Sequence, residues 1–208
     1  MAKTKKAAAA RRGGNKTTSK KSGSKRATTA RRVTRGPQGH GIEDGHGTNN
    51  PPPQMIRTRR SPYHSSRNNG DINGIVLHYT TGSTTEGTLS WFENNPNSVS
   101  AHYVIGRDGR IYQMVDDSER ANHCAGGNRH TIGIEHVATA GQRLAAAQEQ
   151  ASIQLIKWLV AQYDIPLARI QGHRYADDYT GAGTDCPHSL FGDRTEQAVI
   201  NWVQANIA

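Results

Sequence analysis

The segment GHRYADDYTGAGTDCPHSLF, residues 172–191, combines residue types that commonly bind metal ions. It contains His173 and Cys186, and Cys186 is one of two cysteines in the chain of 208 residues. A neutral imidazole and a thiolate are ordinary zinc ligands, and a catalytic zinc site takes three protein ligands while a fourth position stays open for water. Two ligands from this segment do not complete such a site, so a third must come from another part of the chain.

His78 is the candidate for the third ligand. It lies near the end of NGIVLHY, residues 73–79, a short run rich in branched apolar residues that predicts a buried strand. A lone histidine at such a place is more often a hydrogen-bonded core residue. His78, His173 and Cys186 together form an open three-ligand set, however, and we predict that they hold one Zn²⁺ per chain.

The elements that must position these residues follow from the same kind of pattern. We expect a helix at residues 85–95 with Leu89, Trp91 and Phe92 facing inward, and a C-terminal helix capped by Asp193 with Glu196 at its third position. The other expected elements are a hairpin at 102–115, a strand at 131–137, a helix at 144–164 and a short strand from Ile170. This mixture predicts an α/β fold, a single domain with a central mixed β-sheet flanked by helices.

The charges of the chain are divided unevenly. Residues 1–70 hold 17 of the 26 Lys and Arg but only two acidic residues, a net charge of +15, whereas residues 71–208 carry −6. The basic N-terminal part has almost no apolar side chains other than alanine, so it cannot bury enough surface to offset the entropy of ordering. We therefore predict a disordered basic tail and linker at 1–60 and the folded domain at 61–208.

Targeting and redox signals are few. The basic start is followed by AAAA, which is much shorter than the apolar region of a signal peptide, and no stretch has the length of a membrane-spanning helix. We expect synthesis in the cytoplasm without a signal peptide, release by a separate route, and a monomer. Cys124 and Cys186 could form a disulfide, but not while Cys186 binds a metal ion.

Five segments resemble the zinc-dependent N-acetylmuramoyl-L-alanine amidases, a family that includes amidase-type phage lysozymes, recycling amidases and peptidoglycan recognition proteins. In chain order they are VLHYTTG, VSAHYVIGRDGRIYQMV, ANHCAGGN, TIGIEHV, and GHR followed by TDCP. Each segment alone is a weak signal, but all five in the family's order make a specific match. The resemblance covers about residues 71–206 and none of the tail.

The resemblance implies a role for each residue of the site. It supports His78, His173 and Cys186 as the zinc ligands, with Asp185 as the rival third ligand, and it implies that Glu135 is the general base. Thr184 stands where many relatives have a lysine that stabilises the oxyanion, and a hydroxyl can donate a hydrogen bond there but brings no charge. The substrate contacts that the family pattern implies are His123, Thr80, Asn128 and His102.

Other positions have plainer interpretations or depart from the family. His102 is also read as a hydrogen-bonded structural residue, and Cys124 as a small buried one. His188 stands where relatives usually have glycine, and we read it as a residue of a surface loop. Ala101 stands where some phage amidases have a tyrosine that assists catalysis, and this chain lacks that tyrosine.

The implied activity is hydrolysis of the amide between N-acetylmuramic acid and the L-alanine of the peptidoglycan stem. In this family zinc polarises the carbonyl and lowers the pKa of its bound water, while the general base takes the proton. We expect a phage lysin whose basic tail binds anionic envelope polymers or the outer membrane. The alternatives are a recycling or virion-associated amidase whose tail binds nucleic acid, and a non-catalytic peptidoglycan-binding module.

Overall fold

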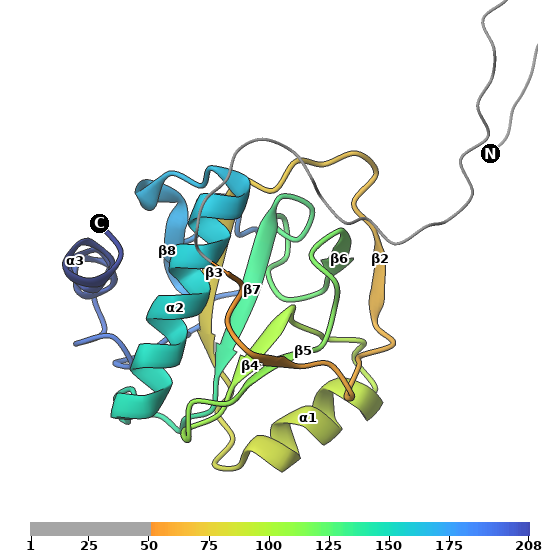
Figure 1. Ribbon diagram of the computed structural model, residues 1–208, viewed down its shortest axis with the longest axis horizontal. Coiled ribbons are helices and arrows are strands. Elements are labelled where there is room, and N and C mark those ends of the chain that lie inside the picture. The colour runs from red at the N-terminus through yellow and green to blue at the C-terminus, as the bar shows by residue number, and fades with distance from the viewer. Residues whose placement is uncertain (1–50) are drawn as a thin grey trace, which may run out of the picture. The chain divides into compact units, whose positions relative to one another are not determined.

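A computed structural model describes residues 51–208 of the chain, and the tail expected at residues 1–50 lies outside the described part (Figure 1). Its centre is a six-stranded sheet in the order β1-β5-β4-β7-β3-β8, in which β4 and β5 are antiparallel and all other neighbours are parallel. The strands are β1 (Met55–Ile56), β3 (Gly74–Tyr79), β4 (Tyr103–Ile105), β5 (Ile111–Gln113), β7 (Thr131–His136) and β8 (Ile170–Gly172). A separate antiparallel pair joins β2 (His64–Ser66) to β6 (Glu119–Ala121).

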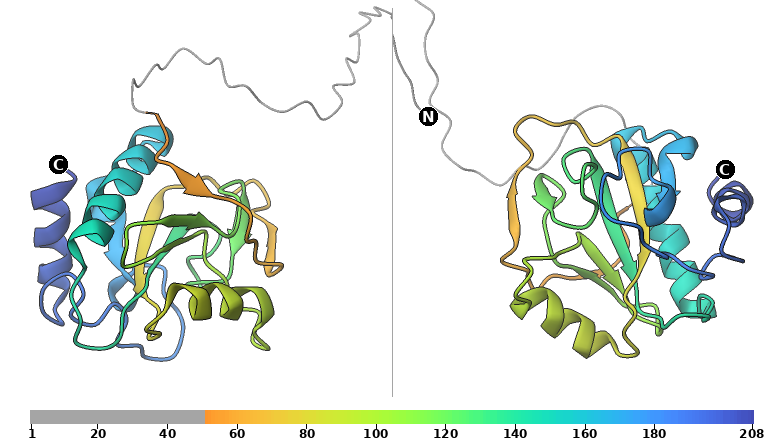
Figure 2. Two further views of the ribbon diagram at one scale, coloured as in Figure 1. Left: turned by 60° about the horizontal axis from the view of Figure 1, so that its bottom comes forward. Right: turned by 180° about the vertical axis from the view of Figure 1, so that it is seen from behind.

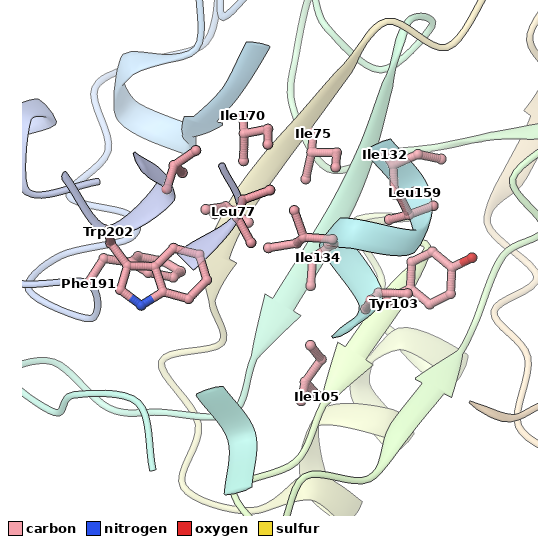
Figure 3. Close-up of a cluster of buried hydrophobic side chains, with 14 of the residues drawn as sticks. Ile75, Leu77, Tyr103, Ile105, Ile132, Ile134, Leu159, Ile170, Phe191 and Trp202 are labelled. Carbon is pink, nitrogen blue, oxygen red and sulfur yellow. The ribbon is translucent and has the colours of Figure 1, made fainter. Parts of the chain in front are cut away.

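Alternation along β3 and β7 divides the sheet into an apolar face and a face that carries the site. Successive side chains of a strand point to opposite faces. Ile75 and Leu77 of β3 and Ile132 and Ile134 of β7 lie on one face, within the main hydrophobic cluster (Figure 3). The alternate residues of the two strands, which include His78, are therefore turned to the other face.

Helices cover both faces of the sheet. On the apolar face, α2 (Ala146–Tyr163) contributes Leu155 and Leu159 and α3 (Glu196–Asn206) contributes Trp202 to the main cluster (Figures 1 and 3). The opposite face is covered in part by α1 (Thr85–Asn94) (Figure 2). Leu89 and Phe92 of this helix pack with Val104 of β4. Two short 3-10 helices, η1 (Leu167–Arg169) and η2 (His173–Tyr175), flank β8. These layers confirm the predicted α/β class and the central mixed sheet.

Two details of the predicted helices are wrong. Trp91 does not face inward, because its neighbour Phe92 occupies the buried direction and the next residue on a helix is turned by about 100°; Trp91 is 48% exposed. The cap of α3 is Thr195, whose hydroxyl accepts the N–H of Ala198, whereas Asp193 accepts the N–H of Thr195. The acid that was expected to cap the helix supports the capping residue instead.

The segment just before the expected domain boundary is part of the fold. The sequence predicts a tail as far as residue 60, but Met55 and Ile56 pair with β5, and Arg59 forms ion pairs with Glu86 and Glu93 of α1. The sequence does not predict β1, which has only two residues, or β2 and β6, whose residues are mostly polar and so show no apolar run. Among residues 51–208, no helix has both the length and the apolar character needed to cross a bilayer.

Candidate metal centre

The three predicted ligands meet at the carboxyl ends of adjacent parallel strands. His78 lies near the end of β3, His173 follows β8 directly, and Cys186 comes from the loop that leads toward α3. One candidate ligand atom from each residue lies within 4.8 Å of the other two. Ligands commonly bind outside the carboxyl ends of strands in α/β sheets, and the fold brings together here three residues that span more than a hundred positions of sequence.

Close backbone packing places Cys186 beside the strands. A Cβ atom on Gly172 would lie 2.7 Å from Cδ of Pro187, so only glycine at the end of β8 lets the Cys186 loop approach. The N–H of Arg174 donates to the carbonyl oxygen of Cys186 at 2.8 Å, and the N–H of Tyr79 donates to Cys186 Sγ at 3.4 Å. The backbone of Cys186 is therefore held by the residue after His173, and its sulfur by the end of β3.

The donor set fits zinc. His173 Nε2 is buried and has no hydrogen-bond partner within the described residues, which is unusual for a buried polar atom. His78 Nδ1 lies 3.7 Å from Cys186 Sγ. Burial lowers the pKa of His173 to about 4 and that of His78 well below its usual range, so both imidazoles are neutral and can bind a metal ion. Two imidazole nitrogens and one sulfur are a common zinc set with an open position.

Asp185, the rival ligand, faces away from this group. Its two carboxylate oxygens pair with Arg174 at 2.9 Å and with Arg194 at 2.8 Å, and all three side chains are largely exposed. Asp185 is absent from the ligand cluster of the described residues. The geometry therefore favours Cys186 over its neighbour.

Glu135 lies beside the ligands on the same face of the sheet. It is the register partner of His78 across the parallel pair β3 and β7. Its Oε2 atom is buried and has no hydrogen-bond partner among residues 51–208, and burial raises the pKa of the carboxyl to about 8. Glu135 also lines a cleft of about 410 Å³ together with residues of β3, the following loop and α1, among them Thr80 and Trp91. An unpaired carboxyl at the wall of a cleft is typical of an acid or base that acts on a ligand.

Thr184 and Thr80 have hydroxyls that also serve the backbone. Thr184 Oγ1 accepts the N–H of Cys186 at 3.1 Å, which leaves the hydrogen of the hydroxyl available to another acceptor. Thr80 Oγ1 donates to the carbonyl oxygen of Gly82 at 3.2 Å and lines the cleft beside Glu135. Both positions are compatible with the roles that the family pattern implies.

His123 and Asn128 are placed differently from simple groove residues. His123 is only 7% exposed, and its ring lies between His78 and Thr131, with Nδ1 at 3.2 Å from His78 Nε2. Asn128 Oδ1 accepts the N–H groups of His123 and Cys124 at 2.8 and 2.6 Å, so it holds the loop that carries His123. His123 therefore contacts a candidate ligand, and Asn128 fixes the backbone that carries His123. The sequence gives no indication of a role for Thr131 beyond its place in an apolar strand.

His102 agrees with the structural interpretation. It is 0% exposed, its Nδ1 accepts the N–H of Gly133 at 2.9 Å, and its Nε2 lies 3.1 Å from the carbonyl oxygen of Glu119. A side chain without exposed surface does not reach a substrate in the cleft. His102 Nε2 also lies 2.7 Å from Nη2 of the buried Arg67, a residue that no pattern in the sequence indicates.

The remaining residues fall into supporting positions. Cys124 and Cys186 are both free thiols, so the disulfide that the sequence left open is not formed, and Cys124 packs with Val76 as a small buried residue. His188 has a left-handed backbone with φ of 55°, a conformation that favours glycine, and its Nδ1 accepts the N–H of Gly141 at 3.3 Å. It joins two loops, as expected for a loop residue.

Comparison with known proteins decides the family. The N-acetylmuramoyl-L-alanine amidase family profile matches residues 68–189, which contain all three candidate ligands and Glu135. The chain belongs to this family. Within it, N-acetylmuramoyl-L-alanine amidase A of Achromobacter lyticus is 38% identical over 118 residues, which cover 55% of this chain and 61% of that protein. N-acetylmuramoyl-L-alanine amidase XlyA of Bacillus subtilis strain 168 is 31% identical over 124 residues, 56% of this chain and 39% of that protein.

Solved amidase structures share the fold. The endolysin N-acetylmuramoyl-L-alanine amidase LysCS from Clostridium intestinale matches 76% of this chain and 99% of its own, with a TM-score of 0.54 and 20% identity. The match to the curated amidases spans at most 61% of their length, so their remaining parts have no counterpart in the aligned region.

Proposed function

We propose that this protein is a zinc-dependent amidase that hydrolyses the bond between N-acetylmuramic acid and the L-alanine of the peptidoglycan stem. The observation that carries the proposal is the cluster of His78, His173 and Cys186, with ligand atoms within 4.8 Å of one another, beside a buried Glu135 that has no hydrogen-bond partner for Oε2 in the described part of the chain. Family membership supports the same reaction and the same substrate.

Separate residues bind the metal ion, transfer the proton and stabilise the oxyanion. Zinc held by His78, His173 and Cys186 would supply Lewis-acid polarisation of the scissile carbonyl and would lower the pKa of a bound water. Glu135 takes the proton of the attacking water and returns it to the leaving amine; its raised pKa suits a group that must both accept and donate near neutral pH. The Thr184 hydroxyl donates a hydrogen bond to the developing oxyanion.

The cleft beside Glu135 is where we place the substrate. It is lined by Tyr79, Thr80 and Trp91, and the Trp91 ring is one of two large hydrophobic side chains exposed among the described residues. An exposed aromatic ring offers an apolar face against which the C–H groups of a sugar can pack. We therefore assign Trp91 to the muramic acid side of the scissile bond.

Digestion of purified peptidoglycan, with and without a chelator, tests the function directly. Mass analysis should find stem peptides that begin with a free L-alanine amine, and the chelator should abolish their release. Release of fragments cut within the glycan or within the stem would contradict the proposed bond. Binding to peptidoglycan without any release would favour the non-catalytic module.

The biological role we propose is lysis of a host cell wall by a phage endolysin, supported by the shared fold with the endolysin LysCS. Residues 1–50 contain 13 Lys and Arg and two acidic residues, and we propose that this basic tail binds anionic polymers of the cell envelope. Nucleic acid is the competing partner because its phosphates attract the same charges. A virion-associated or recycling enzyme would then be the alternative role.

A further inference from the structure

A chain of hydrogen bonds runs from His78 through His123 and Thr131 to a backbone carbonyl group. At its far end, Thr131 Oγ1 lies 2.9 Å from the carbonyl oxygen of Gly127. A carbonyl oxygen can only accept, so the hydroxyl donates its one hydrogen there. Thr131 Oγ1 also lies 3.3 Å from His123 Nε2 and, with its hydrogen already used, can only accept from it. His123 Nε2 therefore carries a hydrogen.

The second step concerns the charge of His123. Its ring is buried, and its hydrogen-bond partners among residues 51–208 are His78 and Thr131, neither of which is a carboxylate. A buried imidazolium without an acidic partner is costly, so the ring is neutral and its single N–H hydrogen is on Nε2. His123 Nδ1 is then an acceptor, and at 3.2 Å it accepts from His78 Nε2.

The direction of these hydrogen bonds thus determines which nitrogen of His78 carries no hydrogen. With its hydrogen on Nε2, His78 presents the lone pair of Nδ1, and Nδ1 is the atom that lies 3.7 Å from Cys186 Sγ. We propose that His123 and Thr131 are positioning residues that hold His78 in the one tautomer able to bind a metal ion beside Cys186. A metal-binding histidine commonly donates its other N–H to a partner that orients it, and here that partner is a second imidazole. The inference relies on the proposed function for the metal, but the tautomer belongs to the metal-free chain.

Packing holds the His123 ring in its position beside His78 without any metal ion. A Cβ atom on Gly133 would lie 2.4 Å from Cγ of His123, so the ring occupies the space that the side chain of any other residue at 133 would need. Asn128 holds the backbone of His123 through the hydrogen bond described above. The acceptor for His78 is therefore in place before a metal ion binds.

Nuclear magnetic resonance of the metal-free, full-length protein reads the tautomer directly. Long-range proton–nitrogen correlations should place the hydrogen of both His78 and His123 on Nε2. The variant Thr131→Val keeps the shape of the side chain but removes the acceptor of the His123 hydrogen. It should show mixed tautomers at both histidines, and its zinc affinity in competition with a chelator should fall about 10- to 100-fold.

Ser61→Ala is the matched control. Ser61 is also buried, and its hydroxyl donates to the carbonyl oxygen of Phe92 at 2.6 Å. It takes no part in the hydrogen-bond chain from His78 to Gly127. It should lower stability without changing the tautomers or the zinc affinity. Hydrogen on Nδ1 of His78 in the wild-type protein would overturn the inference, as would unchanged tautomers and zinc affinity in Thr131→Val. The wild-type spectrum decides the matter if that variant does not fold. A protein with the expected tautomers but no amidase activity would instead refute the proposed function.

Discussion

His78 and Glu135 are register partners across the parallel strands β3 and β7, and they point to the same face of the sheet. This pairing places a candidate metal ligand directly beside a carboxyl group whose Oε2 is buried and has no hydrogen-bond partner within residues 51–208. Neighbours in register are held by the hydrogen bonds of the sheet rather than by a loop, so their spacing is rigid.

Zinc loading should require all three ligands. Alanine substitution of His78, His173 or Cys186 should each abolish stoichiometric zinc, because two ligands rarely retain it. Asp185→Ala should keep its zinc, since the Asp185 carboxylate pairs with Arg174 and Arg194 instead. Metal analysis of the purified variants checks both statements. Loss of zinc from Asp185→Ala with retention in Cys186→Ala would reverse the assignment.

Glu135→Gln should lower activity and raise stability together. Loss of the general base should slow hydrolysis about a hundredfold or more. The folded-state pKa of Glu135 is raised from 4.5 to about 8, so the wild-type chain loses stability as the pH rises through this range. At pH 8 the metal-free variant should be more stable than the wild-type protein, because glutamine stays neutral while the buried Glu135 carboxyl begins to lose its proton. Denaturant titration of both metal-free proteins at pH 4.5 and pH 8 measures the difference, which should shrink at the lower pH.

Acid should destabilise the metal-free protein through its buried neutral histidines. Burial and the nearby His123 and Arg67 lower the pKa of His102 well below its usual range, and burial lowers that of His136 to about 4. The unfolded chain then binds more protons at these histidines below about pH 6.5, so their contribution to stability is complete above that pH and falls toward pH 4. Denaturant titrations of metal-free Glu135→Gln between pH 6.5 and 5, in which the opposite effect of Glu135 is removed, should show this fall. A flat profile there would mean that the histidines are protonated in the folded state.

Trp91→Ala should weaken substrate binding more than it slows the chemical step. Loss of one exposed aromatic contact should raise KM about three- to tenfold with a small change in kcat, because such a contact is similar in the ground state and the transition state. Ile200→Ala is the matched control, since Ile200 is the other large exposed hydrophobic residue among residues 51–208 and lies on α3, outside the cleft. Equal kinetics for the two variants on soluble muramyl peptides would remove Trp91 from the substrate site.

Removal of residues 1–50 should separate delivery from catalysis. The truncated chain keeps β1 and every site residue, so it should digest isolated peptidoglycan at a rate close to that of the full chain. It should bind intact cells much less at low salt, and this difference should disappear at high salt because exposed charges are screened over about 8 Å at physiological ionic strength. Equal binding of both chains to cells, with loss of binding to nucleic acid, would make nucleic acid the partner of the tail.

The point of truncation matters for that experiment. A chain that begins near Asn69 would lack β1 and β2 and also the buried Arg67, which donates to the carbonyl oxygens of Asp117 and Thr131. Such a chain should be less stable than one that begins at Pro51. Comparison of their unfolding midpoints shows whether the segment between them belongs to the folded domain.

The amino-acid sequence by itself determined the longer elements, the candidate ligands and the family. The central strands and helices are long enough for alternation or helical spacing to show, and His78, His173 and Cys186 are recognisable because few residue types bind zinc. The short strand β1 has too few residues to carry a periodic signal. Its pairing with β5 depends on contacts between distant parts of the chain.

Only the tertiary structure decided how the supporting residues act. Nothing in the local sequence indicates that His123 lies between His78 and Thr131, because the three residues are brought together by the register of two strands and by a glycine at position 133. The same register makes Glu135 a carboxyl that is buried without a hydrogen-bond partner for Oε2 among the described residues. Residue type and spacing can name a ligand, but hydrogen-bond direction and desolvation depend on what surrounds each atom in space.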